Sequence, residues 1–202
     1  MALNILFTGA IIVILWFIVS RALFSKLKVF NRKIAPMNKK KYYLLVGLII
    51  FSLIAFFAYM DMQGMNMFST VGGFEGETYS KIKDSYMTFF WSFAYAIIFV
   101  VATIYYYFRR DLSEALGIVL GTVLMLWGGL EDIIYYVFIG QPLNTNLPWL
   151  WETPLSLGSR ILGYDTVTPL GLWFNLGIYT VITIIIIKYL RKTNKTICGV
   201  RI

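Results

Sequence analysis

Five long apolar stretches, separated by short polar or charged ones, dominate the pattern of the chain. They cover roughly residues 4–24, 42–60, 84–108, 114–139 and 168–190. About 20 apolar residues suffice for a helix to cross a bilayer. The pattern therefore predicts an all-α integral membrane protein, in which a single transmembrane domain, residues 1–202, forms a five-span helical bundle. We expect the first stretch to be a retained helix rather than a signal peptide, because no basic residue precedes it.

The composition agrees with this interpretation and excludes several kinds of site. The chain is 59% hydrophobic, whereas soluble domains are about 45–50% apolar. It has no histidine, which excludes haem, zinc, copper or di-iron sites that depend on histidine ligands. The one cysteine, Cys198, excludes an intramolecular disulfide. Nothing in the chain resembles a nucleic-acid-binding module.

The basic residues predict the orientation of the spans. Of the 18 Lys and Arg residues, 15 lie in the first connection, the third connection and the C-terminal tail. Positive charge collects on cytoplasmic loops, so we expect the N-terminus outside and the C-terminus in the cytoplasm, with the protein in the cell membrane. The basic stretch at residues 21–41 is a topology signal, and it is also a candidate surface for anionic lipids.

The connection between the last two spans is unusually apolar. It contains Trp149 and Trp151, residues that are typical of membrane interfaces. Two places, Asn146-Leu147-Pro148 and Thr153-Pro154, resemble helix starts with proline in the first turn. We therefore expect a short interfacial or re-entrant helical segment here, acting either as a cap over a site or as an interfacial anchor.

Two adjacent carboxylates, Glu131 and Asp132, interrupt the fourth span. An acidic side chain at the centre of a transmembrane helix costs about 2.5–3.5 kcal/mol on insertion scales, so something must offset this cost. On a continuous helix the acids straddle a narrow face that points into the bundle. That face carries Gly117, Gly121, Gly128 and Tyr135, and small residues mark close helix contacts.

Polar residues of the neighbouring spans and of the outer connection complete a candidate ligand- or cation-binding site. With the acid pair and Tyr135, its members are Ser92, Asn175, Glu152 and Arg160. Two close carboxylates in a low dielectric are not expected to ionise together unless a cation or a basic group lies between them. The pair can thus bind a proton or a metal cation, act as acid and base, or hydrogen-bond neighbours and fix the bundle.

A methionine cluster follows the second span: Met60, Met62, Met65 and Met67. Thioether sulfur suits Cu(I), and over these eight residues the spacing resembles the methionine motifs of high-affinity copper transporters. The resemblance implies copper as a cofactor or cargo. The chain departs from that family in lacking its three-span organisation and its intramembrane Met-x-x-x-Met. Methionine is also a flexible hydrophobe that suits an interface.

Three functions remain open on these residues. The first is an outward-facing acidic site that binds a cation or small polar ligand in transport or metal handling. The second is an accessory or structural subunit of a larger membrane complex, with partner subunits on its glycine-rich faces. The third is an intramembrane lipid-modifying enzyme that uses the acid pair, although no nucleophile or phosphate-binding motif accompanies it. We expect no catalytic residue and lean towards a non-enzymatic role.

Overall fold

The structure of the protein is a computed structural model, which describes residues 38–70, 77–109, 111–151 and 153–198. Every regular element in these ranges is helical. The long helices are α2 (Lys39–Thr70), α3 (Glu77–Arg109), α4 (Leu112–Trp127), α5 (Leu130–Phe138) and α7 (Pro169–Cys198). Between α5 and α7 lie η1 (Pro148–Leu150), η2 (Pro154–Ser156) and α6 (Leu157–Ile161). The first predicted span, residues 4–24, and the first part of the basic stretch lie outside the described residues.

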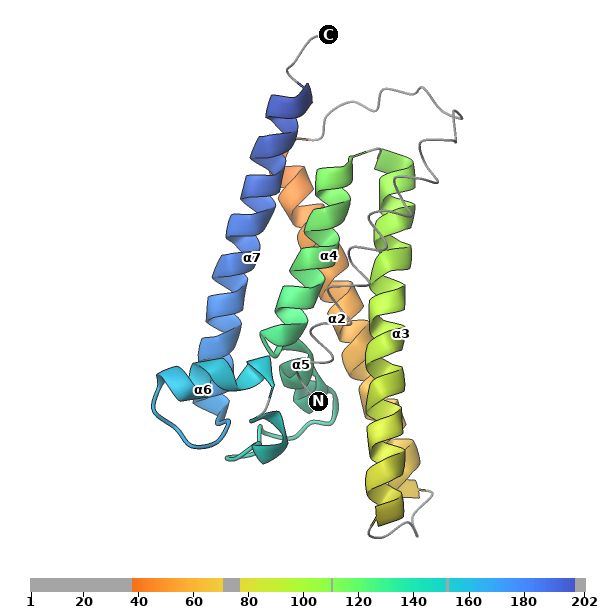
Figure 1. Ribbon diagram of the computed structural model, residues 1–202, viewed down its shortest axis with the longest axis vertical. Coiled ribbons are helices and arrows are strands. Elements are labelled where there is room, and N and C mark those ends of the chain that lie inside the picture. Colours follow the sequence, from red (N-terminus) through yellow and green to blue (C-terminus); the bar gives the residue numbers. More distant parts are fainter. Residues whose placement is uncertain (1–37, 71–76, 110, 152, 199–202) are drawn as a thin grey trace.

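Helix α4 forms the centre of the bundle (Figure 1). It packs against α7, α3 and α2, while α5 packs against α2 and α6 against α7. The N-terminus of α2, the C-terminus of α3, the N-terminus of α4 and the C-terminus of α7 lie at the same end (Figure 1). We call this the basic end, because Lys41, Arg109 and Lys188 lie towards it.

Three helices are long and apolar enough to cross a membrane: Lys40–Met65, Ser85–Arg109 and Pro169–Lys192. The pair α4 and α5 qualifies as a fourth if the two are counted as one bent span. These helices confirm the all-helical architecture and suggest a membrane protein. The count of five spans and the orientation remain predictions.

The second and third helices are longer than the sequence pattern suggested. A polar connection was expected over residues 61–83, but α2 continues to Thr70 and α3 already begins at Glu77. No proline interrupts this region, and a single glycine inside a helix costs only about 1 kcal/mol relative to alanine. The polar side chains of Asp61 and Gln63 therefore lie on a helix rather than in a loop.

The fourth predicted span, residues 114–139, is not one continuous helix. Helix α4 ends at Trp127, α5 begins at Leu130, and the two axes differ by 67°. The break falls at Gly128 and Gly129, and Gly129 has a φ of +88°, a backbone conformation that favours glycine. A Cβ on Gly129 would overlap with the Leu172 side chain and approach Leu155 to 2.8 Å.

The connection between α5 and α7 contains short helices at the predicted places. Pro148 begins η1 and Pro154 begins η2, and the Thr153 hydroxyl accepts a hydrogen bond from the Leu155 amide at 3.3 Å. Their apolar side chains form a cluster with α5 and the first turn of α7: Ile133, Leu147, Leu150, Leu155, Val167 and Leu172. The connection thus packs directly against the helix break.

Helix α6 is attached to the start of α7 by contacts between small residues. A Cβ on Gly158 would overlap with the Gly171 carbonyl, and a Cβ on Gly171 would overlap with Ser159. The Ser159 hydroxyl also accepts a hydrogen bond from the Thr168 amide at 3.1 Å. These contacts fix the connection relative to α7.

We predict that Gly129→Ala destabilises the protein more than Gly140→Ala. Both glycines have positive φ, 88° and 66°, so both substitutions cost about 1–2 kcal/mol of backbone strain. Only at Gly129 does the added methyl group also meet Leu155 and Leu172, since nothing lies within 4 Å at Gly140. Thermal unfolding in detergent measures the difference. Equal losses for the two variants would show that the packing at the break is loose.

Candidate functional site

The acid pair occupies the first turn of α5, immediately after the break. Glu131 is buried, with 7% of its surface exposed, and Asp132 is partly buried. The first backbone N–H groups of a helix lack intrahelical partners, and the helix dipole favours negative charge there. The break therefore places both carboxylates at a helix N-terminus, close to free N–H groups and to the positive end of the dipole. In the middle of a continuous span they would have neither.

Asn175 of α7 stabilises the other side of the break. Its side-chain amide donates a hydrogen bond to the Trp127 carbonyl oxygen at 3.1 Å. In a continuous helix this carbonyl would accept from the amide of Glu131. Asn175 is fully buried, so it replaces a helical hydrogen bond deep inside the bundle. The predicted association of Asn175 with this region thus takes the form of a contact with the backbone of the break.

A third carboxylate, Asp61 of α2, belongs to the same region. The Tyr86 hydroxyl of α3 donates a hydrogen bond to Asp61 Oδ1 at 3.1 Å. Room for this hydroxyl comes from Gly64, where a Cβ would overlap with the Tyr86 side chain. Helices α2 and α3 are thereby joined by a partly buried polar contact, about one turn from the end of the apolar part of α2.

Electrostatic interactions link Asp61 to the acid pair. The charge of Asp61 acts on both Glu131 and Asp132, and that of Glu131 acts on Tyr86. Among the side chains that the structure describes, those whose charge acts on Glu131 are the two aspartates. One oxygen of Glu131, Oε1, is buried and has no hydrogen-bond partner among them. We call Asp61, Glu131 and Asp132, with Tyr86, the carboxylate cluster.

The structure places the remaining predicted site residues in different surroundings. Tyr135 interacts electrostatically with Asp61 and Glu131 and so lies beside the carboxylate cluster. Ser92 is exposed on α3, where its hydroxyl donates to the Thr88 carbonyl at 2.8 Å. Arg160 is exposed, and its guanidinium lies 4.6 Å from the ring of Trp151 and donates to the Trp151 carbonyl at 3.0 Å. Glu152 lies outside the described residues.

The methionines lie on the continuous helix α2 rather than in a loop. Successive residues of a helix are rotated by about 100°, so Met60 and Met62 lie roughly 200° apart around the axis. The Met60, Met62 and Met65 side chains are partly buried, and that of Met67 is outside the described residues. Helix α2 alone therefore does not direct these thioethers towards one ion, and copper remains a prediction from spacing.

A metal site built from acidic or cysteine residues is not visible in the described ranges. No group of three or more His, Cys, Asp or Glu residues there could hold a metal ion. The carboxylate cluster is thus close enough for its charges to interact, but its members do not converge on one coordination point. The arrangement suits a ligand that one or two oxygens can bind.

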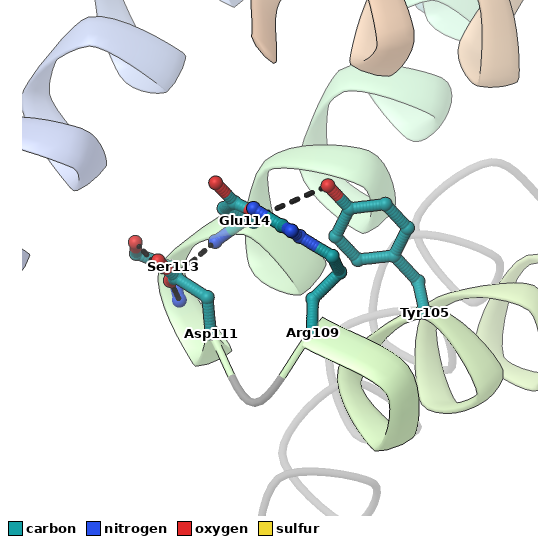
Figure 2. Close-up of polar contacts among 5 residues, drawn as sticks. All are labelled: Tyr105, Arg109, Asp111, Ser113 and Glu114. Carbon is teal, nitrogen blue, oxygen red and sulfur yellow. Dashed lines mark hydrogen bonds and ion pairs between the residues drawn. The ribbon is translucent and has the colours of Figure 1, made fainter. Parts of the chain in front are cut away.

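A second buried acid, Glu114, was not recognised from the sequence. It lies at the basic end of α4, where the Tyr105 hydroxyl donates to its Oε2 at 2.8 Å and the Arg109 Nε lies 3.5 Å away (Figure 2). Asp111 caps α4 beside it by accepting from the amides of Ser113 and Glu114. Unlike Glu131, this acid has a hydroxyl and a cation as partners.

Asp61 and Tyr86 were missed because the apolar pattern was taken to end at Met60. The signal was the continuation of apolar residues at helical spacing through Met67 and Phe68, which indicates that the helix extends past Asp61. Glu114 was missed for another reason, since it was taken simply as the first residue of the fourth span. Its contacts with Tyr105 and Arg109 depend on the turn between α3 and α4.

Comparisons with known proteins add nothing to these observations. The chain matches no protein-family model, and neither a curated protein nor a solved structure matches it. What the chain does must therefore be inferred from its own residues.

We predict that Asp61 and Tyr86 are energetically coupled. A double-mutant cycle with Asp61→Asn and Tyr86→Phe should give a coupling free energy of about 1.5–3 kcal/mol, the range for a hydrogen bond to a charged group. The free energy of unfolding in detergent provides the measurement. As a control, Ser92→Ala on the exposed side of α3 should be additive with Asp61→Asn. Additive effects of Asp61→Asn and Tyr86→Phe would contradict the contact.

Proposed function

We propose that this chain is an integral membrane protein that binds a cation, the proton above all, at the carboxylate cluster as a step in transport. The observation that carries the proposal is the grouping of Asp61, Glu131 and Asp132 at a break in a span, with no described basic side chain acting on Glu131. A group of carboxylates that is partly or fully buried attracts a positive ligand.

The free-energy cost of burying three carboxylates exceeds the stabilisation that the helix N-terminus provides. Each carboxylate at the depth of a helix centre costs about 2.5–3.5 kcal/mol. A helix N-terminus stabilises a nearby negative charge by typically about 0.3–1 kcal/mol, and by about 2 kcal/mol at most. The first turn of α5 therefore offsets only part of the cost of two acids, and Asp61 adds a third. Neutralisation by a bound cation removes the remainder.

The geometry favours a proton over a metal ion. A metal needs several ligand atoms around one point, and the described residues contain no such group of three acids. A proton needs only one carboxyl oxygen and an acceptor beside it. The buried Glu131 Oε1, which has no partner among the described residues, is the atom best suited to hold one.

The distribution of charge supports a place in the cell membrane with the basic end in the cytoplasm. Lys41, Arg109 and Lys188 lie towards that end, as the preference of cytoplasmic loops for positive charge requires. The carboxylate cluster lies towards the opposite end of the bundle and would then face outwards. With residues 4–24 as a further helix, and with α4 and α5 counted together, the chain would have five spans.

We predict that the purified protein in liposomes passes protons when a potassium diffusion potential is applied. A pH-sensitive dye inside the vesicles measures the flux. Glu131→Gln and Asp61→Asn should reduce it to the leak of protein-free vesicles, because each removes a carboxylate from the cluster. Asp165→Asn, which changes an exposed carboxylate outside the cluster, should leave it unchanged.

Two results would contradict the proposal. One is a flux that Glu131→Gln and Asp61→Asn leave at the wild-type level. The other is the absence of flux from a folded wild-type protein together with partner proteins that co-purify at fixed stoichiometry, which would favour an accessory subunit.

A further inference from the structure

A groove runs along the bundle between α2 and α7, with a volume of about 490 Å³. Its walls are almost entirely apolar, with Val46 and Ile50 on one side and Ile184 on the other. Met125 of α4 and Leu130 of α5 also line it. The two bounding helices run antiparallel (Figure 1), so Tyr43 and Lys188 lie at its basic end and Phe51 and Thr180 at the other.

Gly47 keeps this groove open. It lines the groove, and a Cβ built on it would meet nothing within 4 Å. The residues about one helical turn before and after it on α2, Leu44 and Phe51, are 64% and 54% exposed. Any larger residue at position 47 would fill space that the fold leaves free.

Four polar side chains lie within the apolar lining: Tyr43 on α2, and Thr180, Thr183 and Lys188 on α7. The Thr180 hydroxyl donates to the Met125 sulfur at 3.7 Å, and the Thr183 side chain is only 6% exposed. Lys188 is exposed at the basic end. It is therefore the charged group that the lining presents to a ligand.

We propose that this groove binds one phospholipid with an anionic headgroup. An acyl chain lies between α2 and α7, and the phosphate group faces Lys188. This order of groups matches the groove, since a phospholipid carries its charged phosphate at one end of its acyl chains and Lys188 lies at one end of the apolar lining. The positive charge at the mouth selects for the anionic lipids that are enriched in the cytoplasmic leaflet. The proposal does not depend on cation binding at the carboxylate cluster.

Native mass spectrometry of the full-length protein from bilayers of phosphatidylglycerol and phosphatidylcholine tests the proposal. The wild type should retain one phosphatidylglycerol. Gly47→Leu should lose it, because the leucine side chain occupies the groove. Gly177→Leu is the matched control, because Gly177 also has nothing within 4 Å and does not line the groove, so this variant should retain the lipid.

Substitution of Lys188 distinguishes a specific site from an apolar surface. Lys188→Gln should lower phosphatidylglycerol occupancy about fivefold, the factor that corresponds to about 1 kcal/mol for one basic residue near an anionic surface. Lys41→Gln, which changes an exposed lysine at the same end but outside the groove, should not lower it. Circular dichroism and size-exclusion chromatography confirm that each variant is folded.

Four outcomes would overturn the proposal. The first is equal lipid retention by Gly47→Leu and Gly177→Leu. The second is equal occupancy of phosphatidylcholine and phosphatidylglycerol in the wild type. The third is a change from dimer to monomer in Gly47→Leu, which would assign the groove to a second copy of the chain. The fourth is efficient disulfide trapping between Gly47→Cys and Val13→Cys, which would assign it to residues 4–24.

Discussion

A break in a buried helix exposes backbone groups that need new partners, because an unpaired buried backbone group costs free energy comparable to a lost hydrogen bond. The rest of this structure is arranged around that requirement at Gly128 and Gly129. On the side of α4, the Asn175 side-chain amide donates a hydrogen bond to the Trp127 carbonyl oxygen. On the side of α5, the first turn carries two carboxylates, the charge that helix N-termini favour. Leu155 and Leu172 can pack directly against the turn because Gly129 has no side chain there.

The two ends of the bent helix pair show two ways of accommodating a buried acid. At the basic end, Glu114 is held by the Tyr105 hydroxyl and the Arg109 guanidinium (Figure 2), and such a paired carboxylate needs no further ligand. At the break, Glu131 has carboxylates as its charged neighbours within the described part of the chain. This contrast within one pair of helices is why we propose the carboxylate cluster, rather than Glu114, as the place where a positive ligand binds.

The sequence predicted the helical architecture well because the apolar runs are long and the turn signals around them are strong. The helix starts at Pro148 and Pro154 followed from local rules of capping. The acid pair was found because charge inside an apolar run is conspicuous. The 67° bend was not predicted, because a Gly-Gly pair can continue a helix, form a close contact or break, and the tertiary contacts of Leu155 and Leu172 decide between these. Asp61 was missed because the second apolar run was taken to end at Met60, and because its hydrogen bond to Tyr86, 25 residues away, leaves no mark on the local pattern.

The central claim is that the break groups carboxylates that hold a proton inside the bundle. Infrared spectroscopy of the protein in lipid bilayers at neutral pH tests it most directly, through the C=O stretching band of a protonated carboxyl group. We predict that the wild type shows this band, that Glu131→Gln removes it, and that Asp165→Asn leaves it in place. A wild-type spectrum in which every carboxyl group absorbs as an ionised carboxylate would contradict the account.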